Sequence, residues 1–451
     1  MTFKFLKTIH LSSVASITIL ACATTLGATI TAQASGLTEV TLKLPRQAPS
    51  AKPGKPAATD GTTTATIRSD SLSKKRSHES DEANQPLVVT VSLDKQQLTL
   101  FRGIDPIKKS KISSGKEGHS TPTGIFSILG KKKYHESNIY SDAPMPYMQR
   151  LTWSGIALHE SGSVPSFPAS HGCVRLPRGF AKELYSTTPH GTHVVITPEP
   201  VRPSRVDHPT LFRPIGSKPA LAALRLGISD YEASLGIGYQ NKSDTKTNGP
   251  LRIYVTRATR RDKIQHVQKM LNSLGYSAGE PDGIYGKTTI ASVRRFQRLE
   301  GLKTTGTLSD ETLELLEKQT GSNGIADGKL FIRQNQKPVF ESPIAFREPH
   351  KPLGTHLLLT TALTTTSANW IGVSISSRIP RWVIQENNID KLLAGKRLRV
   401  DVEDALDQLI IPKEAKNFIE ENLSENSSFA ISDNGLGTET GKGTDFIVQT
   451  Y

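Results

Sequence analysis

Between residues 87 and 197, apolar residues occur in short runs or at every second position. Two such segments, Leu87–Val91 and Leu98–Phe101, flank the polar Asp94-Lys95-Gln96 and predict a β-hairpin. We expect further strands at Gly124–Leu129, Leu151–His159 and His193–Thr197, and a short helix at Pro177–Tyr185. The pattern therefore predicts a mainly β domain over residues 85–199.

Between residues 258 and 320 the apolar spacing changes to three and four residues, the period of an α-helix. Three helices are expected, with apolar positions at Ile264, Val267, Leu271 and Leu274, then Ile290, Val293 and Phe296, then Leu313 and Leu316. Gly275 is expected to end the first helix. The pattern predicts a small all-α domain, for which a plain helical spacer is the alternative.

The remaining segments differ in composition. Residues 326–451 show strand-like alternation, then a helical stretch at Pro412–Leu423 and a Gly-rich tail, which predicts a C-terminal β-rich α+β domain. Residues 200–257 contain many Pro, Gly and Ser, and we expect a linker. Residues 35–84 have too few apolar side chains to form a core, which predicts a disordered tether.

The first residues have the pattern of an export signal. Lys4 and Lys7 precede the apolar stretch Leu11–Leu26, and Ala32-Gln33-Ala34 fits a signal-peptidase site, so we expect a signal peptide over residues 1–34. A lipidation motif ending at Cys22 is the alternative, although Leu20 fits it poorly. Export predicts a periplasmic or cell-envelope location.

The formal net charge is +14 at pH 7. In an exported protein this charge favours anionic envelope polymers or lipids over nucleic acid as partners. A basic, solvated surface without a specific partner is the alternative.

The candidate chemistry lies at Ser170-His171-Gly172-Cys173-Val174-Arg175. The chain has two cysteines, and the predicted cleavage removes Cys22, so Cys173 has no partner for an internal disulfide. A thiol near histidine favours a nucleophile, and His159 or His171 could take its proton to form a thiolate–imidazolium pair.

Two features of this segment suit acyl transfer. Gly172 lets the backbone approach a substrate closely, and N–H groups near Cys173 could bind an oxyanion. A buried structural cysteine is one alternative. A metal site of His159, His171 and Cys173 is another, although its spacing is unlike structural zinc sites.

Residues 87–197 resemble the L,D-transpeptidase (YkuD-type) catalytic domain. The matching residues are His159, the Ser170–Arg175 motif, Thr121-Pro122-Thr123-Gly124, Gly191-Thr192 and Val194. The resemblance implies a mixed β-sandwich with Cys173 as nucleophile, His159 as base and no cofactor or metal. It also implies that Ser170, His171, Gly172 and Arg175 shape the site or contact substrate.

One residue departs from the family pattern. Glu160 stands where the family usually has glycine after the first histidine. In some members a backbone carbonyl near this position orients the histidine, and Glu160 still has a carbonyl to offer.

The implied reaction is acyl transfer on peptidoglycan. Cys173 would attack a tetrapeptide stem after the L-centre of diaminopimelate, release D-Ala and pass the acyl group to another stem, forming a 3–3 crosslink. An outer-membrane protein amine is an alternative acceptor, and water would make the enzyme an L,D-carboxypeptidase or endopeptidase. A non-catalytic wall-binding protein is the remaining alternative, which the Cys–His pair disfavours.

The helical segment resembles the peptidoglycan-binding three-helix domain. The matching residues are Val267, Gln268, Leu271, Leu274–Tyr276, Asp282, Gly283, Gly286, Thr289, Phe296, Gln297, Gly301, Leu302, Gly306 and Thr312. The resemblance implies cell-wall binding, which would raise the local substrate concentration, but it names no ligand residue.

The C-terminal region contains motifs similar to those of the predicted catalytic domain. The pairs are Trp370–Ile375 with Trp153–Leu158, Pro352–Thr355 with Pro122–Ile125, Gly443–Val448 with Gly191–Ile196, and Ile411-Pro412 with Leu176-Pro177. In this alignment Ser376 replaces His159, and no cysteine follows Cys173. We therefore expect a catalytically inactive repeat, with chance matching of short strand patterns as the alternative.

Overall fold

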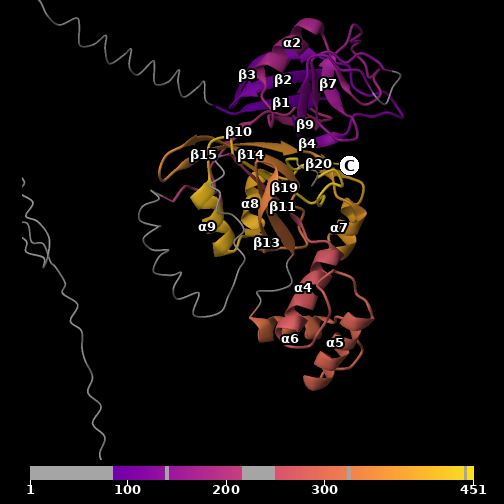
Figure 1. Cartoon of the computed structure of the whole chain (residues 1–451), viewed down its shortest axis with the longest axis vertical. Coiled ribbons are helices and arrows are strands. Elements are labelled where there is room, and N and C mark those ends of the chain that lie inside the picture. Colours follow the sequence, from indigo (N-terminus) through magenta and orange to yellow (C-terminus); the bar gives the residue numbers. More distant parts are fainter. Residues whose placement is uncertain (1–84, 138–141, 216–248, 322–326, 441–443, 451) are drawn as a thin grey trace, which may run out of the picture. The chain divides into compact units, whose positions relative to one another are not determined.

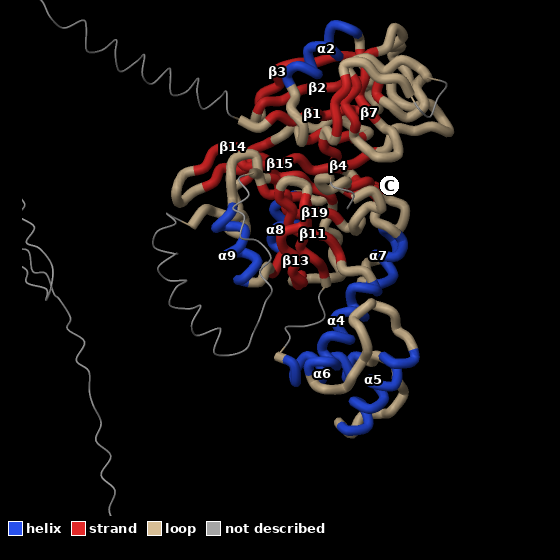
Figure 2. The backbone as a smooth tube through the Cα atoms, viewed as in Figure 1, coloured by secondary structure: helices blue, strands red, loops and turns tan. Residues whose placement is uncertain are grey.

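The computed structural model describes residues 85–137, 142–215, 249–321, 327–440 and 444–450. The predicted signal peptide, Cys22, the predicted tether and residues 216–248 of the predicted linker lie outside the described residues. Figure 2 shows the strands gathered in sheets and a separate group of helices formed by α4, α5 and α6. In the part of the chain that the structure describes, no helix has the length and apolar character needed to cross a membrane.

The first large sheet has the strand order β20-β4-β9-β1-β2-β3. Its strands are β1 (Leu87–Ser92), β2 (Gln97–Arg102), β3 (Asp105–Lys111), β4 (Thr123–Ser127), β9 (His193–Thr197) and β20 (Val448–Thr450). Strands β1 and β2 form the predicted hairpin, and β1 is parallel to β9. The sequence did not predict β3, because this edge strand is polar, exposed and rich in lysine.

A smaller four-stranded sheet has the order β5-β6-β7-β8. Its strands are β5 (Gly130–Lys132), β6 (Met148–Arg150), β7 (Ala157–Glu160) and β8 (Val174–Leu176). The single strand predicted over Leu151–His159 is wrong, because a turn at residues 151–156 separates β6 from β7. Helix α2 (Arg178–Thr187) follows β8, with Pro177 as its N-cap residue.

The second large sheet has the order β10-β15-β14-β19-β11-β12-β13-β18. Its strands are β10 (Ser204–Val206), β11 (Leu251–Arg257), β12 (Gly328–Gln334), β13 (Lys337–Phe346), β14 (Thr355–Leu363), β15 (Ala368–Ile375), β18 (Leu409–Ile410) and β19 (Ser428–Ser432). Strands β10 and β11 lie within residues 200–257, so the predicted linker needs correction there.

Helices pack against this second sheet. The remaining elements of the region are α7 (Arg381–Glu386), α8 (Val402–Gln408), α9 (Lys413–Asn422), a 3-10 turn at Lys391–Leu393 and the short pair β16 (Ser377–Arg378) and β17 (Arg397–Leu398). Apolar residues of α8 and α9 share one core with the central strands of the sheet. Figure 1 shows the ribbons of both helices beside this sheet.

The two large sheets share a topology. Strands β13-β12-β11-β19-β14 have the same order and the same relative directions as β3-β2-β1-β9-β4. A register shift falls between Leu100 and Phe101 in β2 and between Ile332 and Arg333 in β12. Helix α9 precedes β19 with Pro412 as its N-cap, as α2 precedes β9. We call the chain from β1 to β9 the first repeat and the chain from β11 through β20 the second repeat. The five strands just compared are the scaffold that the two repeats share.

The strand pairing shows that the predicted equivalences between the two repeats are wrong in detail. The counterpart of β9 is β19, whereas Val448 lies in β20 and pairs with the first sheet. Strand β15 pairs with β14, whereas Ala157–Glu160 pairs with β6 and β8, so these segments are not equivalent. The second repeat begins at β11 and not at residue 326, and the structure gives no support for Ser376 as the counterpart of His159.

The helical unit is inserted into the second repeat. Helices α4 (Arg260–Ser273), α5 (Lys287–Leu299) and α6 (Asp310–Thr320) lie between β11 and β12, whose last paired residues are Arg257 and Gly328. The unit thus occupies the position of a hairpin turn. All three predicted helices are present, and Leu274 is the C-cap of α4, one residue before the predicted stop at Gly275.

Apolar side chains from both repeats form a shared core. The first repeat contributes Val88, Phe101, Ile125 and Val195, and the second contributes Tyr254, Phe331, Leu357 and Ala430. The opposite faces of the same strands pack into two further cores, one for each repeat. The central strands are therefore buried on both faces, which explains their nearly continuous apolar sequences.

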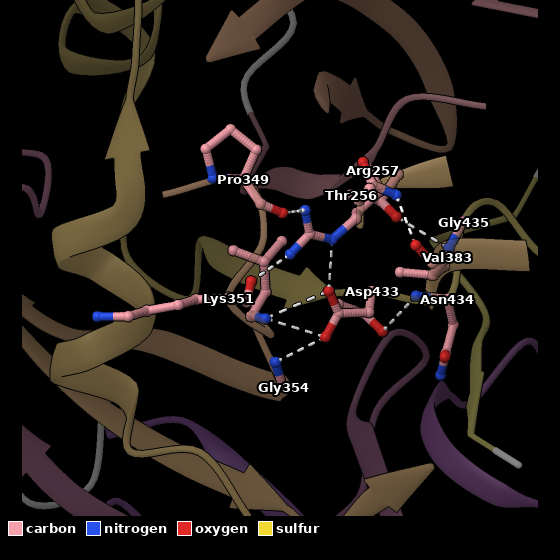
Figure 3. A network of polar contacts seen from close by, with 12 residues as sticks. Thr256, Arg257, Pro349, Lys351, Gly354, Val383, Asp433, Asn434 and Gly435 are labelled. Atoms are coloured by element: carbon pink, nitrogen blue, oxygen red, sulfur yellow. Dashed lines mark hydrogen bonds and ion pairs between the residues drawn. The ribbon is translucent and has the colours of Figure 1, made fainter. Parts of the chain in front are cut away.

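A buried ion pair lies where the helical unit joins the second repeat. Arg257, the last residue of β11, donates from Nε to Asp433 Oδ1 at 2.7 Å, and the two side chains are 0% and 4% exposed. Figure 3 shows the rest of the network, in which Arg257 binds the Pro349 carbonyl oxygen and the Gly354 N–H donates to Asp433. These bonds satisfy both buried charges.

Candidate active site

The segment before Cys173 is held by side-chain hydrogen bonds. Ser170 Oγ donates to the Cys173 carbonyl oxygen at 2.5 Å and accepts the Gly172 N–H at 3.2 Å. Thr121, in the upstream motif, donates from Oγ1 to the Gly172 carbonyl oxygen at 2.7 Å. Ser170 and Thr121 therefore fix the backbone on both sides of the peptide that precedes the thiol, and the Gly172 N–H already has a partner.

Gly172 is required by its conformation. Its φ is +109°, a region that disfavours other residues, and an added Cβ would lie 2.9 Å from Ile156 Cδ1. The missing side chain at Gly172 thus leaves room for Ile156, and the predicted close approach to a substrate stays a prediction. The Cys173 thiol, which is partly buried, donates to the Gly155 carbonyl oxygen with an Sγ to O distance of 3.4 Å.

His159 lies in β7, paired in register with Arg175 of β8. Its Nδ1 is 2.7 Å from the Glu160 carbonyl oxygen, so Nδ1 must hold the proton that is donated. Nε2 then has the lone pair that a base needs. The replacement of the family's usual glycine by Glu160 therefore leaves this contact unchanged, because the backbone carbonyl of Glu160 orients His159 and its side chain does not.

Burial changes the titration of both residues. It lowers the pKa of His159 to about 4, partly opposed by the Glu160 hydrogen bond, and the positive charge of Arg175 lowers it further. Burial also raises the pKa of the Cys173 thiol, against the lowering effects of the Ala157 N–H and Arg175. Both shifts favour a neutral thiol and a neutral imidazole at neutral pH, so the thiolate–imidazolium pair is not the favoured form before substrate binds.

One pocket brings most of the predicted site residues together. Its volume is about 460 Å³, and its lining includes Cys173, His159, Ser170, His171 and Arg175. Further lining residues that the sequence analysis missed include Met145, Pro146, Ser154–Ile156 and Gly162. They come from loops whose sequences have no periodic or catalytic pattern.

His171 and Arg175 have different environments. The His171 ring contacts His119 edge-on, with centroids 4.7 Å apart, and its side chain is exposed. Backbone bonds between Arg175 and Ser113 hold β8 at the pocket. Because His159 is buried, oriented and next to the strand after Cys173, the structure favours His159 over His171 as the proton acceptor.

The alternative of a metal site requires ligand side chains that lie close together. Within the described residues, no three His, Cys, Asp or Glu side chains are grouped so that they could hold a metal ion. His159, His171 and Cys173 therefore do not form a ligand set in this structure.

Comparison with protein families assigns two segments. Residues 86–196 match the L,D-transpeptidase catalytic domain (YkuD), and residues 260–316 match a putative peptidoglycan-binding domain. These matches confirm both resemblances that the sequence indicated. No curated protein matches the chain.

Solved structures similar to the chain include several L,D-transpeptidases. One from Mycobacterium smegmatis has 22% identity and a TM-score of 0.23, over 25% of this chain and 58% of that one. Those from Xylanimonas cellulosilytica and Stackebrandtia nassauensis both have 29% identity, with TM-scores of 0.23 and 0.24. The Xylanimonas match covers 25% of this chain and 61% of that protein's chain, and the Stackebrandtia match covers 26% and 57%. The chain thus spans little more than half the length of these proteins.

Proposed function

We propose that this chain is a periplasmic L,D-transpeptidase that uses Cys173 as nucleophile and His159 as base. The observation that supports it most strongly is the shared pocket of Cys173 and an oriented His159 within a segment that matches the catalytic family. A peptidoglycan-binding domain in the same chain is consistent with action on the cell wall.

The first step forms a thioester. His159 Nε2 takes the thiol proton as Cys173 Sγ attacks the carbonyl carbon after the L-centre of diaminopimelate. Because the resting pair is neutral, proton transfer accompanies the attack and does not precede it. The tetrahedral intermediate then breaks its C–N bond, and His159 returns the proton to the nitrogen of the departing D-Ala.

The second step transfers the acyl group. The side-chain amine of another stem attacks the thioester, its proton passes to His159, and the C–S bond breaks to release the thiolate. The thiolate then regains the proton from His159. The product is a 3–3 crosslink, or a protein–wall linkage when the amine belongs to an outer-membrane protein.

Arg175 contributes charge at the site. Its guanidinium favours the thiolate, as its effect on the pKa of Cys173 indicates. Ser170, by fixing the Cys173 carbonyl oxygen, keeps the thiol directed toward the pocket while the sulfur bonds to substrate. His171 lines the same pocket, and we propose that it contacts the stem peptide.

The test uses the purified protein, a Cys173→Ala variant and disaccharide-tetrapeptides. Mass spectrometry is expected to show a dimer that has lost one D-Ala with wild type, and no dimer with the variant. Disaccharide-tripeptide alone would indicate that water is the acceptor, which is the carboxypeptidase alternative. Binding without any product would show that the chain is a non-catalytic wall-binding protein.

A further inference from the structure

Glu439 connects the C-terminal segment to the candidate active site. This residue follows β19 of the second repeat, yet its carboxylate accepts the Trp153 N–H at 2.5 Å. Both carboxylate oxygens also lie 3.3 Å from the Ser154 nitrogen. Hydrogen bonds to a carboxylate are shorter and stronger than those between neutral groups, and these exposed bonds tie Glu439 to the turn between β6 and β7.

That turn faces the candidate nucleophile. Its Gly155 carbonyl oxygen accepts the Cys173 thiol, and the Ala157 N–H just beyond it bonds to the sulfur and lowers the pKa of the thiol. The Ile156 side chain lies against Gly172. Ser154, Gly155 and Ile156 also line the pocket. Any shift of the turn therefore moves the thiol and one wall of the pocket.

Hydrogen bonds within the turn at residues 151–156 join residues that are close in the sequence. The Ile156 N–H donates to Thr152 Oγ1 at 3.0 Å, and the Gly155 N–H donates to the Thr152 carbonyl oxygen at 3.3 Å. The N–H groups of Trp153 and Ser154, at the tip, are the ones that Glu439 accepts. Glu439 thus anchors the tip of the turn from outside.

Strand β20, which also follows β19 in the chain, contacts the first repeat at β4. Strand β20 pairs with β4, and the Val448 carbonyl oxygen would lie 2.0 Å from a Cβ on Gly124, so this motif glycine permits the close approach. Thr450 Oγ1 also donates to Thr123 Oγ1 at 2.8 Å. Thr121, two residues before Thr123, holds the Gly172 carbonyl oxygen.

We propose that Glu439 is a positioning residue for Cys173, through which the second repeat holds the first in its reactive arrangement. Its carboxylate fixes the turn at residues 151–156, so that the backbone groups of Gly155 and Ala157 stay aligned with the thiol. Glu439 acts through this turn and does not touch substrate. The inference rests on the proposed function for its effect on turnover, but the alignment of the thiol can be measured independently.

The experiment compares Glu439→Ala, Glu439→Gln and the exposed-residue control Glu425→Ala in the full chain. All of them have Cys22→Ser, so that Cys173 is the sole cysteine. Two rates are measured at equal folded fraction, checked by circular dichroism. One is dimer formation from disaccharide-tetrapeptide, and the other is alkylation of Cys173 by iodoacetamide.

We expect Glu439→Ala to slow dimer formation by about tenfold or more, mainly in kcat, because small misplacements of reacting groups are costly. Alkylation should become faster, because a loosened turn exposes the thiol to the reagent. Glu439→Gln keeps an acceptor oxygen and should lie between wild type and Glu439→Ala, and Glu425→Ala should match wild type.

Two results would overturn the positioning role. In the first, Glu439→Ala matches wild type in both rates. In the second, both rates fall together, which contradicts the expected increase in alkylation from a loosened turn. If wild type forms no dimer, the proposed function fails, and the alkylation rates alone decide the role of Glu439: an increase in Glu439→Ala supports it, and no change contradicts it.

Discussion

The two repeats share a strand order but differ in what lies between their fourth and fifth strands. In the first repeat, β4 and β9 are separated by the four-stranded sheet and the segment that hold His159 and Cys173. In the second, β14 and β19 are separated by β15, the short pair β16–β17 and helices α7, α8 and α9. The same five-stranded scaffold therefore occurs with and without the candidate catalytic residues. These residues belong to the segment inserted into the scaffold of the first repeat.

A second difference lies in the hairpins. The β1–β2 hairpin of the first repeat closes with a short turn at residues 93–96, whereas the β11–β12 hairpin of the second closes around the whole helical unit. Both ends of the putative peptidoglycan-binding domain are therefore joined to paired strands and not to a single flexible linker. We expect wall binding by α4–α6 to restrain the second repeat directly.

The largest expected effect concerns the thiol, which only the first repeat has. Cys173→Ala should reduce dimer formation to background, a loss of up to about a millionfold when a nucleophile is removed. Cys173→Ser, which keeps a polar side chain of similar size, should be nearly as inactive. Product analysis by mass spectrometry checks both, and turnover by Cys173→Ala would place the chemistry elsewhere in the molecule.

The next prediction compares the buried histidines of the two repeats. His159→Asn should lower kcat by roughly a hundredfold to ten-thousandfold, the usual range for loss of a general base. His356 is more completely buried than His159. It bonds to Ser374 and the Leu353 carbonyl oxygen and does not line the Cys173 pocket, so His356→Asn should leave kcat per folded molecule unchanged. Equal losses in both variants would remove the functional distinction between the repeats.

A buried ion pair in the second repeat and a half-exposed one in the first should contribute differently to the free energy of unfolding. Asp433→Ala leaves Arg257 buried without its partner and should lower the free energy of unfolding by about 3 to 5 kcal/mol. Glu183→Ala in the first repeat removes a half-exposed pair with Lys108 and should cost at most about 1 kcal/mol. Urea unfolding measures both, and similar costs would contradict the assigned burial.

A further effect on stability is a pH dependence common to both repeats. Burial lowers the pKa of His159 and of His356 to about 4, from an ordinary value of 6.5. The unfolded chain therefore binds protons more readily than the folded chain. Each histidine should contribute on the order of 1 to 3 kcal/mol to the free energy of unfolding above pH 6.5, and this contribution should be lost as the pH falls toward 4. His356→Asn should flatten part of this loss. An unchanged pH profile in that variant would show that His356 is not buried in its neutral form.

The sequence predicted those parts that depend on local pattern. Apolar alternation located β1, β2, β4 and β9, and the residues around Cys173 identified the pocket. It missed β11, although Leu251–Arg257 alternates well, because the inserted helical unit separates this strand from its partner β12. It also missed Glu439, since no local pattern reveals that a residue in the second repeat bonds to a turn in the first.

The sequence left the resting protonation state of Cys173 and its histidine open. Proximity of cysteine and histidine suggests proton transfer, but the direction of each pKa shift depends on burial, which the motif does not encode. The structure shows both groups largely buried, so the neutral forms are favoured. Residue types therefore suggest a chemistry for the site, but they do not determine its protonation state.

The most direct test of the account is to find which residue becomes acylated. The full chain is incubated with disaccharide-tetrapeptide at acidic pH, where few acceptor amines are deprotonated, then digested and mapped by mass spectrometry. The account predicts a disaccharide-tripeptide thioester on Cys173 that is absent from Cys173→Ala. An adduct on any other residue, or dimer formation without acylation of Cys173, would contradict it.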